Sequence, residues 1–471
     1  MTDLDSKYLD LFKHIGAAAS ELGQSAYVVG GFVRDYYLGR LNEKKQPDID
    51  IVTVGSGIAL AEKVAVRLGV EKVNTFKRFG TAQFPIDDID IEFVGARKES
   101  YSPDSRKPVV EDGTLEDDQL RRDFTINALS WSLDEDDFGV LNDPFGGIAD
   151  LQQKIIRTPV SPETTFSDDP LRMLRAVRFA NQLGFTIEPQ TLAGIKAMNQ
   201  RLEIVSKERI ITEVNKMVEC DVPSVGFGLM FNTGLLQVFF PEMVRLAGVD
   251  TIRGISHKDN FWHTLQVLDN VSEMSSDVWL RWSAVMHDIA KPATKAFDDN
   301  AGWTFHGHDA IGARWTKGIF RRLGLPLDER MKFVKKLVRL HLRPIALVSE
   351  EVTDSAIRRL MFDAGEDIDA LMMLCRADIT SKNDRKVKRY LKNFDYVEKR
   401  IKEVEEKDRI RNWQPPVGGA EIMKALDLKP GPVVGKIKTA IEEAILNGDI
   451  PNEYQAAYDY MLYIKDDILN A

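Results

Sequence analysis

Cysteine is scarce in this sequence, which contains only Cys220 and Cys375 among its 471 residues. Each is isolated, without a second cysteine or a histidine at the spacing of a metal site, and such low thiol usage fits a reducing compartment. Long apolar runs are also missing, because none approaches the ~20 residues that a membrane-spanning helix needs. We therefore predict a cytoplasmic protein with no membrane partner, in which both cysteines are inert core residues.

An excess of positive charge is absent as well. Lysine and arginine number 63 against 73 aspartates and glutamates, which gives a net charge of -10. Because phosphate binding needs positive charge, this balance argues against a protein that coats nucleic acid without specificity. One local basic track runs from Lys382 to Glu403, and its pattern is equally typical of the solvated face of a helix.

Strand signals are concentrated near the N-terminus, in residues 26–30, 48–54, 79–86 and 88–95. From Leu120 on, helical periodicity takes over. Six of the seven histidines then lie between positions 257 and 341. We predict an α+β head with a small mixed sheet, followed by an all-α body. The predicted division is a head at 1–150, a helical neck at 151–250, a histidine-rich helical domain at 251–380 and a helical tail at 381–471.

Two glycines and two aspartates stand close together at the start of the head. Gly30 and Gly31 end an apolar strand and permit a tight turn whose N–H groups can meet a phosphate. Arg34 follows one helical turn later as a second anion contact. Asp48 and Asp50 lie on a predicted strand, where a period of two residues puts both carboxylates on one face.

Paired carboxylates on one face are costly unless a cation neutralises them, and hard oxygen ligands suit Mg²⁺. A third carboxylate is available from Asp90 or Glu92, which share a face of a later strand in the same way. Such a set can hold two metal ions that activate an attacking hydroxyl and stabilise a leaving pyrophosphate. The pattern therefore indicates nucleotidyl transfer.

Five motifs occur in the order and spacing of one known family. The motifs are residues 28–53, "RRDFTINAL" (121–129), "DPFGGIADL" (143–151), "SDDPLRMLRAVRF" (167–179) and "VSKERIITE" (205–213). They resemble those of the class II tRNA nucleotidyltransferases, the CCA-adding enzymes, within the DNA-polymerase-β-like superfamily. The resemblance covers about the first half of the chain.

The resemblance implies a role for each matching residue. Asp48 and Asp50 would hold Mg²⁺ with help from Glu92, while the triphosphate of CTP or ATP would bind near Gly30 and Gly31. The remaining implied nucleotide contacts are Arg34, Arg121 and Arg122 for the triphosphate, and Asp123 and Asn127 for the sugar or metal-side groups. For Asp123 the alternative is helix capping.

Base selection is implied for Asp169 and Arg172, which we predict to share one helix face at a spacing of three residues. Ionised aspartate only accepts hydrogen bonds and arginine only donates them. Cytosine and adenine present the complementary order of donor and acceptor, whereas uracil and guanine present the opposite one. Arg175 and Arg178 continue as further nucleotide contacts or as a solvated basic face.

Two departures from the family pattern are present. The family usually has Glu-Asp where this chain has Asp168-Asp169, which keeps the reading carboxylate and shortens its neighbour. The segment between Gly39 and Asp48 is also longer than usual, and its extra residues, Leu41 to Gln46, are most simply a surface loop.

The histidine-rich region resembles the HD phosphohydrolase signature. Imidazole and carboxylate ligands suit Mn²⁺, Fe, Ni²⁺ or Co²⁺, with water as nucleophile. Helical segments carry the expected ligands of a divalent transition metal, which are His263, His287, Asp288, Asp378, His308 and His341. Of these, His308 and His341 are candidates for binding a second ion.

The favoured hypothesis is an enzyme that adds C, C and A to the 3′ end of tRNA from CTP and ATP. The alternatives are a poly(A) polymerase, an enzyme adding only CC or only A, and an HD phosphohydrolase with an RNA-binding head. The region from Arg97 to Asp118, expected as a loop, favours full addition. The tail from Lys382 onward is a weaker candidate for binding the tRNA elbow.

Overall fold

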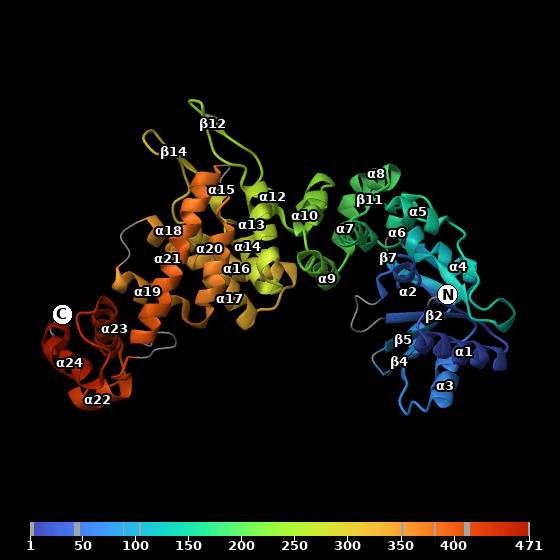
Figure 1. Ribbon diagram of the computed structural model, residues 1–471, viewed down its shortest axis with the longest axis horizontal. Helices are drawn as coiled ribbons and strands as arrows, with labels where there is room; N and C mark the ends of the chain where they lie inside the picture. The colour runs from blue at the N-terminus through green and yellow to red at the C-terminus, as the bar shows by residue number, and fades with distance from the viewer. Residues whose placement is uncertain are drawn as a thin grey trace. The chain divides into compact units, whose positions relative to one another are not determined.

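The computed structural model describes residues 4–41, 48–87, 89–102, 105–349, 353–380, 383–408 and 415–469 (Figure 1). The chain divides into two compact units, residues 1–217 with 225–239, and residues 218–224 with 240–471. No helix within these described ranges combines the length and the apolar character needed to cross a membrane. The Lys382 end of the basic track and residues 42–47, which include most of the predicted insertion, lie outside the described residues.

A mixed seven-stranded sheet forms the head, as predicted. Its strands lie in the order β3 (Asn74–Phe76), β4 (Thr81–Ile86), β5 (Ile89–Gly95), β2 (Asp48–Val54), β1 (Ser25–Val29), β8 (Ser130–Ser132) and β9 (Leu141–Asn142). All neighbours are antiparallel except β2 and β5, which run parallel. That pairing requires a crossover, which α3 (Gly57–Leu68) provides while burying Leu60, Ala61 and Val64.

Two helices and a separate hairpin lie between strands of this sheet in the sequence. Helix α2 (Gly31–Tyr37) follows β1 directly. The region expected as a loop between Arg97 and Asp118 is instead the hairpin of β6 (Arg97–Ser102) and β7 (Ser105–Asp112), followed by α4 (Leu115–Leu120). Helix α4 begins where it does because Thr114 and Asp117 form a reciprocal capping box.

Helices continue the first unit after the sheet. They are α5 (Gly147–Gln153), α6 (Pro162–Asp168), α7 (Leu171–Leu183), α8 (Pro189–Met198), α9 (Lys207–Val218), α10 (Pro223–Asn232) and α11 (Leu235–Phe239). A short parallel pair, β10 (Ile155–Ile156) with β11 (Thr186–Ile187), connects the segment after α5 to the segment between α7 and α8.

The second unit is helical, as expected, with two added hairpins. Its helices are α12 (Pro241–Val244), α13 (Asn260–Met274), α14 (Val278–Met286), α15 (Lys291–Thr294), α16 (His308–Leu323), α17 (Glu329–Leu340), α18 (Leu342–Ser349), α19 (Asp354–Ala364), α20 (Ile368–Ala377), α21 (Asp384–Asp408), α22 (Gly419–Leu426), α23 (Pro432–Asn447) and α24 (Tyr454–Leu469). The hairpins are β12 (Thr251–Ile252) with β13 (Ile255–Ser256), and β14 (Ala296–Asp298) with β15 (Gly302–Thr304). Helices α22, α23 and α24 share a hydrophobic cluster of their own (Figure 1).

Candidate active site and metal centre

Four carboxylates lie together on one face of the head sheet. The parallel register of β2 and β5 places Asp48 beside Asp90 and Asp50 beside Glu92. On each strand the residues between them, such as Ile49 and Ile91, point into the core and are fully buried. The structure thus brings the carboxylates predicted from two separate sequence segments into one cluster.

Burial and the closeness of like charges change the pKa of one carboxylate in this cluster. Desolvation and the neighbouring charge of Asp50 raise the pKa of Glu92, while Arg97 opposes the shift. A cation held by these oxygens would relieve the repulsion.

Gly30 forms a tight turn beside this cluster. Its φ of 74° is one that side chains rarely adopt, and its N–H donates to the Leu129 carbonyl over 3.1 Å. A Cβ at this position would lie 2.9 Å from Nη1 of Arg122 and 3.5 Å from Oδ2 of Asp50. One predicted phosphate-binding arginine and one predicted metal ligand therefore lie beside the glycine turn.

Three predicted phosphate contacts have protein partners. Arg34 is buried and donates from Nε to Asp35 and from Nη1 to Asn127, each over 2.8 Å. Arg121 and Arg122 both pair with one fully buried carboxylate, Asp118. Sequence reasoning missed Asp118, since a buried partner is not distinguishable from the neighbouring acidic residues of α4.

Asp123 is the centre of a buried polar network. Asn127 donates to it over 2.9 Å, and Arg175 donates from Nε over 2.7 Å. Burial alone would raise the pKa of Asp123, but the charge of Arg175 and the hydrogen bond from Asn127 outweigh burial and hold this pKa at about 2. Since Asn127 also binds Arg34, the network joins α2 to α7.

Arg178 lies in the same buried region. Its Nε is 2.5 Å from the Glu213 carboxylate, and its guanidinium stacks 3.9 Å from the ring centre of Phe179. With only 7% of its surface exposed, it is not part of a solvated basic face. The structure places it as a packed ion pair between α7 and α9.

Asp169 and Arg172 do not share a helix face, which corrects the sequence prediction. Asp169 is the C-cap residue that follows α6, and Pro170 is the N-cap residue that precedes α7, because proline at this position cannot continue the preceding helix. Asp169 instead accepts a forked contact from Arg209, at 2.6 Å and 3.3 Å. Arg172 donates to the Thr165 and Arg121 carbonyls.

Arg209 was not singled out from the sequence, although it lies within the fifth motif. The signal that could have found it is an arginine in the motif that follows the one containing Asp169, a carboxylate that needs a partner. Arg209 is half exposed, with 42% of its side-chain surface accessible, so the pair with Asp169 lies at the surface.

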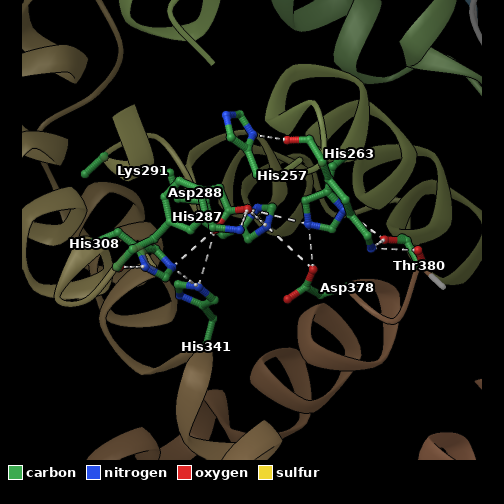
Figure 2. Close-up of polar contacts among 12 residues, drawn as sticks. His257, His263, His287, Asp288, Lys291, His308, His341, Asp378 and Thr380 are labelled. Carbon is green, nitrogen blue, oxygen red and sulfur yellow. Dashed lines mark hydrogen bonds and ion pairs between the residues drawn. The ribbon is translucent and has the colours of Figure 1, made fainter. Parts of the chain in front are cut away.

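All six predicted metal ligands of the second unit converge on one point (Figure 2). They form two groups, and within each group the donor atoms lie within 4.8 Å of one another. The first group is His263, His287 and Asp378, and the second is Asp288, His308 and His341. Residues from α13, α16, the ends of α14 and α17, and the segment after α20 therefore meet, as expected. His306 is exposed and belongs to neither group.

Backbone carbonyls set the tautomer of three of these histidines. Nδ1 of His287, His308 and His341 each lies 2.7 Å from the carbonyl oxygen of the residue three positions earlier. A carbonyl only accepts, so Nδ1 carries the proton and Nε2 presents its lone pair to the cluster.

These lone pairs are close together. Nε2 of His308 is 3.2 Å from Nε2 of His341, and 3.3 Å from the Asp288 carboxylate. Nε2 of His287 is buried without a hydrogen bond to any described residue, although Asp288 lies 3.2 Å away. These nitrogen and carboxylate lone pairs face one another with no proton between them. A metal ion bound at this point would accept the lone pairs and remove their mutual repulsion.

The environment of this cluster favours the metal-binding forms of His341 and Asp378. Burial, with the charge of His287, lowers the pKa of His341 to about 4, so its imidazole is neutral at neutral pH. Burial alone would raise the pKa of Asp378, but the hydrogen bond from His263 holds this pKa at about 2. Lys291 lies 2.6 Å from Asp288 and balances part of its charge.

Comparison with known proteins covers most of the chain. Four family models match: "Poly A polymerase head domain" at 26–157, "Probable RNA and SrmB- binding site of polymerase A" at 184–246, "HD domain" at 260–383 and "tRNA nucleotidyltransferase domain 2" at 353–461.

Similar proteins carry related names. An A-adding tRNA nucleotidyltransferase from Deinococcus radiodurans is 32% identical over 353 residues, which cover 73% of this chain and 78% of that protein. A multifunctional CCA protein from Shewanella frigidimarina is 35% identical, over 64% of this chain and 70% of that protein. Matches to A-adding enzymes of Aquifex aeolicus and Geobacter sulfurreducens span 22% and 28% of those proteins.

A solved structure extends the likeness to the fold. A crystal structure of a tRNA nucleotidyltransferase complexed with a primer tRNA and an incoming ATP analog is 26% identical, with a TM-score of 0.56, and covers 82% of this chain and 99% of that one. The ordered motifs, the carboxylate cluster and these matches agree: the chain belongs to the tRNA nucleotidyltransferase family.

Proposed function

We propose that this chain adds C, C and A to the 3′ end of tRNA, with CTP and ATP as nucleotide donors. The observation that carries the proposal is the parallel pairing of β2 and β5, which gathers Asp48, Asp50, Asp90 and Glu92 on one face beside the Gly30 turn. The matched family models and the named relatives support the same reaction.

The residues at the cluster fit Mg²⁺, because all donors are carboxylate oxygens, and burial together with the charge of Asp50 raises the pKa of Glu92. Asp48 and Asp50 would hold the ion, with Glu92 assisting. When bound, Mg²⁺ neutralises charge at the reacting α-phosphate and favours ionisation of the attacking hydroxyl. The tRNA 3′-oxygen then forms a bond to that phosphorus as the bond to pyrophosphate breaks.

The protein's own groups position this reaction. The Gly30 turn lets the triphosphate approach the backbone closely, and Arg122 lies beside it. Asp169 has spare lone pairs while Arg209 holds it, because an ionised carboxylate accepts about four hydrogen bonds. In our proposal Asp169 accepts from the amino group of cytosine or adenine, and Arg172 donates to the adjacent ring nitrogen.

Incorporation into three tRNA substrates tests the proposal. Purified protein is given tRNA ending at the discriminator base, at C or at CC, with labelled CTP and ATP singly and together. Full addition requires CTP incorporation on the first two substrates and one ATP on the third. Incorporation of ATP alone, and only after CC, would establish the second candidate function, an enzyme that adds only A. The name of the Deinococcus relative, an A-adding tRNA nucleotidyltransferase, favours this candidate. Long A tracts on any RNA would establish a poly(A) polymerase.

The second unit supports a separate proposal, that its histidine cluster holds divalent transition-metal ions and hydrolyses phosphate esters. The two ligand groups and their inward-facing Nε2 atoms carry this proposal. When bound, such an ion activates a water nucleophile. Metal analysis of the purified protein, with phosphodiester and phosphomonoester substrates, tests it. Protein that binds no Mn²⁺, Co²⁺ or Ni²⁺ after reconstitution would contradict it.

A further inference from the structure

The second unit contains a basic groove that the predicted nucleic-acid contacts do not include. It has a volume of about 830 Å³ and lies along α16 and α17, up to the start of α18. The charged side chains that line it are Arg314, Lys332, Lys335, Lys336, Arg339, Arg343 and Asp363. Six cations thus face one carboxylate, in a chain whose net charge is -10. This local excess opposes the charge of the whole chain.

The spacing of these cations directs them to one side of α17. Lys332 lies three and four residues before Lys335 and Lys336, and Arg339 lies three and four residues after Lys336 and Lys335, whereas Leu337 on the other side is fully buried. Arg314 approaches from α16, so two helices present positive charge to one hollow. Gathering like charges in this way costs free energy unless an anion binds there.

Some of these cations have carboxylate partners and two do not. Lys336 pairs with Asp367 at 2.5 Å, and Arg339 and Arg343 pair with Asp309 and Asp363. Arg314 and Lys335 are both exposed, and neither forms an ion pair or hydrogen bond within the part of the chain that the structure describes. Exposed ion pairs contribute little to stability, so a phosphate can also compete for the paired members.

The basic track expected from Lys382 onward is less suited to phosphate. Where its helix, α21, borders a hollow, the charged lining is Glu398, Glu405, Glu406 and Asp369 with one lysine, Lys402. Those carboxylates repel a phosphodiester backbone, whereas the α16–α17 groove attracts it.

We propose that the α16–α17 groove binds the sugar–phosphate backbone of tRNA. Several spaced cations in an open groove fit a chain of phosphates, and they read the shape of a folded RNA rather than its bases. The inference rests on the proposed function for the identity of the RNA. It assigns to the histidine-containing unit a role in substrate binding that is separate from its metal cluster, because none of the six metal ligands lines the groove.

Removal of the two unpaired charges tests the groove. The variant Arg314→Gln with Lys335→Gln leaves no carboxylate without its partner. Lys388→Gln with Lys392→Gln on α21 is the matched control, since both lysines are exposed and it removes the same charge from the rival track. Binding of fluorescent tRNA ending at the discriminator base is measured by anisotropy from 0.05 to about 0.4 M KCl, and intact metal content and thermal unfolding confirm that each variant folds.

We expect the groove variant to weaken tRNA binding by about tenfold or more at about 0.1 M salt, and to reduce the slope of log Kd against log salt by about 1.5, because each lost phosphate contact removes about 0.7 to 0.9. The KM for ATP stays unchanged. Equal losses in both variants, or no loss in the groove variant, would overturn the proposal. So would displacement of tRNA by inorganic phosphate at matched ionic strength, which would indicate a site for small phosphates.

The proposed function and the groove fail in different ways. A wild-type protein that binds tRNA but incorporates no nucleotide would refute nucleotidyl transfer and leave the groove standing if the binding difference persists. A groove variant with unchanged tRNA binding and normal incorporation would refute the groove alone.

Discussion

Asp123 offers a sharp test of how the head is held together, because its environment fixes both the size and the pH dependence of its contribution. The change is Asp123→Asn, which keeps the shape of the side chain and removes its charge. Asp123 is 93% buried, and its pKa lies at about 2, compared with an ordinary value of 3.8. At about 1.36 kcal/mol for each pKa unit, the difference corresponds to roughly 2.4 kcal/mol of folding free energy.

The sign of the pH dependence follows from the direction of the shift. A lowered pKa in the folded state means that the stabilisation is complete above pH 3.8 and is lost as the pH falls toward 2. The free energy of unfolding of the wild type should therefore exceed that of the variant by roughly 2.4 kcal/mol at about pH 7 and by roughly 1.3 kcal/mol at about pH 3.

Trp131 allows the measurement to be confined to the head. It is fully buried and is the only tryptophan in the sequence of the first unit. Urea unfolding is followed by the ¹⁹F signal of 5-fluorotryptophan at this position, assigned with Trp131→Phe. Asp10→Asn, at an exposed site, is the control and should show no such difference. A gap between wild type and Asp123→Asn that stays constant from pH 7 to 3 would refute the assignment of the effect to this carboxylate's charge.

Three further changes test the sites. Asp50→Asn should reduce nucleotide incorporation by at least about a hundredfold, because it removes a ligand charge, while the metal content of the histidine cluster stays the same. Arg209→Met should lower kcat/KM for ATP by roughly tenfold and raise UTP misincorporation, because Asp169 loses its fork; unchanged base selectivity would count against a positioning role. His341→Gln should lose about one bound metal ion per chain, and the exposed His306→Gln none; equal metal content in both would contradict the second ligand group.

The sequence was sufficient to predict what depends on local periodicity. The period of two residues in β2 and β5 predicted that Asp48 and Asp50 share a face and that Asp90 and Glu92 share another. Which strands are neighbours depends instead on the crossover through α3, and the parallel register that joins the two pairs is a tertiary property.

Side-chain partners were less predictable than element types. A three-residue spacing suggested that Asp169 and Arg172 act from one helix, but Pro170 separates them, and Arg209 approaches from a segment 40 residues away. The arginines of the head were predicted as ligand contacts, yet their buried partner Asp118 could not be recognised, because local patterns do not show which carboxylate becomes enclosed. The metal cluster was predicted through a resemblance to a known signature, whereas its tautomers required the carbonyl positions.

The buried network around Asp123 has a mechanical consequence. It links Arg34 of α2, through Asn127 and Asp123, to Arg175 of α7, so the glycine turn cannot separate from the helix after Asp169 without breaking these contacts. Such a separation would forfeit the roughly 2.4 kcal/mol that the charge of Asp123 contributes to folding. On the proposed function, we therefore expect a change of preference from C to A to arise at the solvent-facing pair of Asp169 and Arg209, or from the growing RNA end itself, rather than from a tilt of α7 against the sheet.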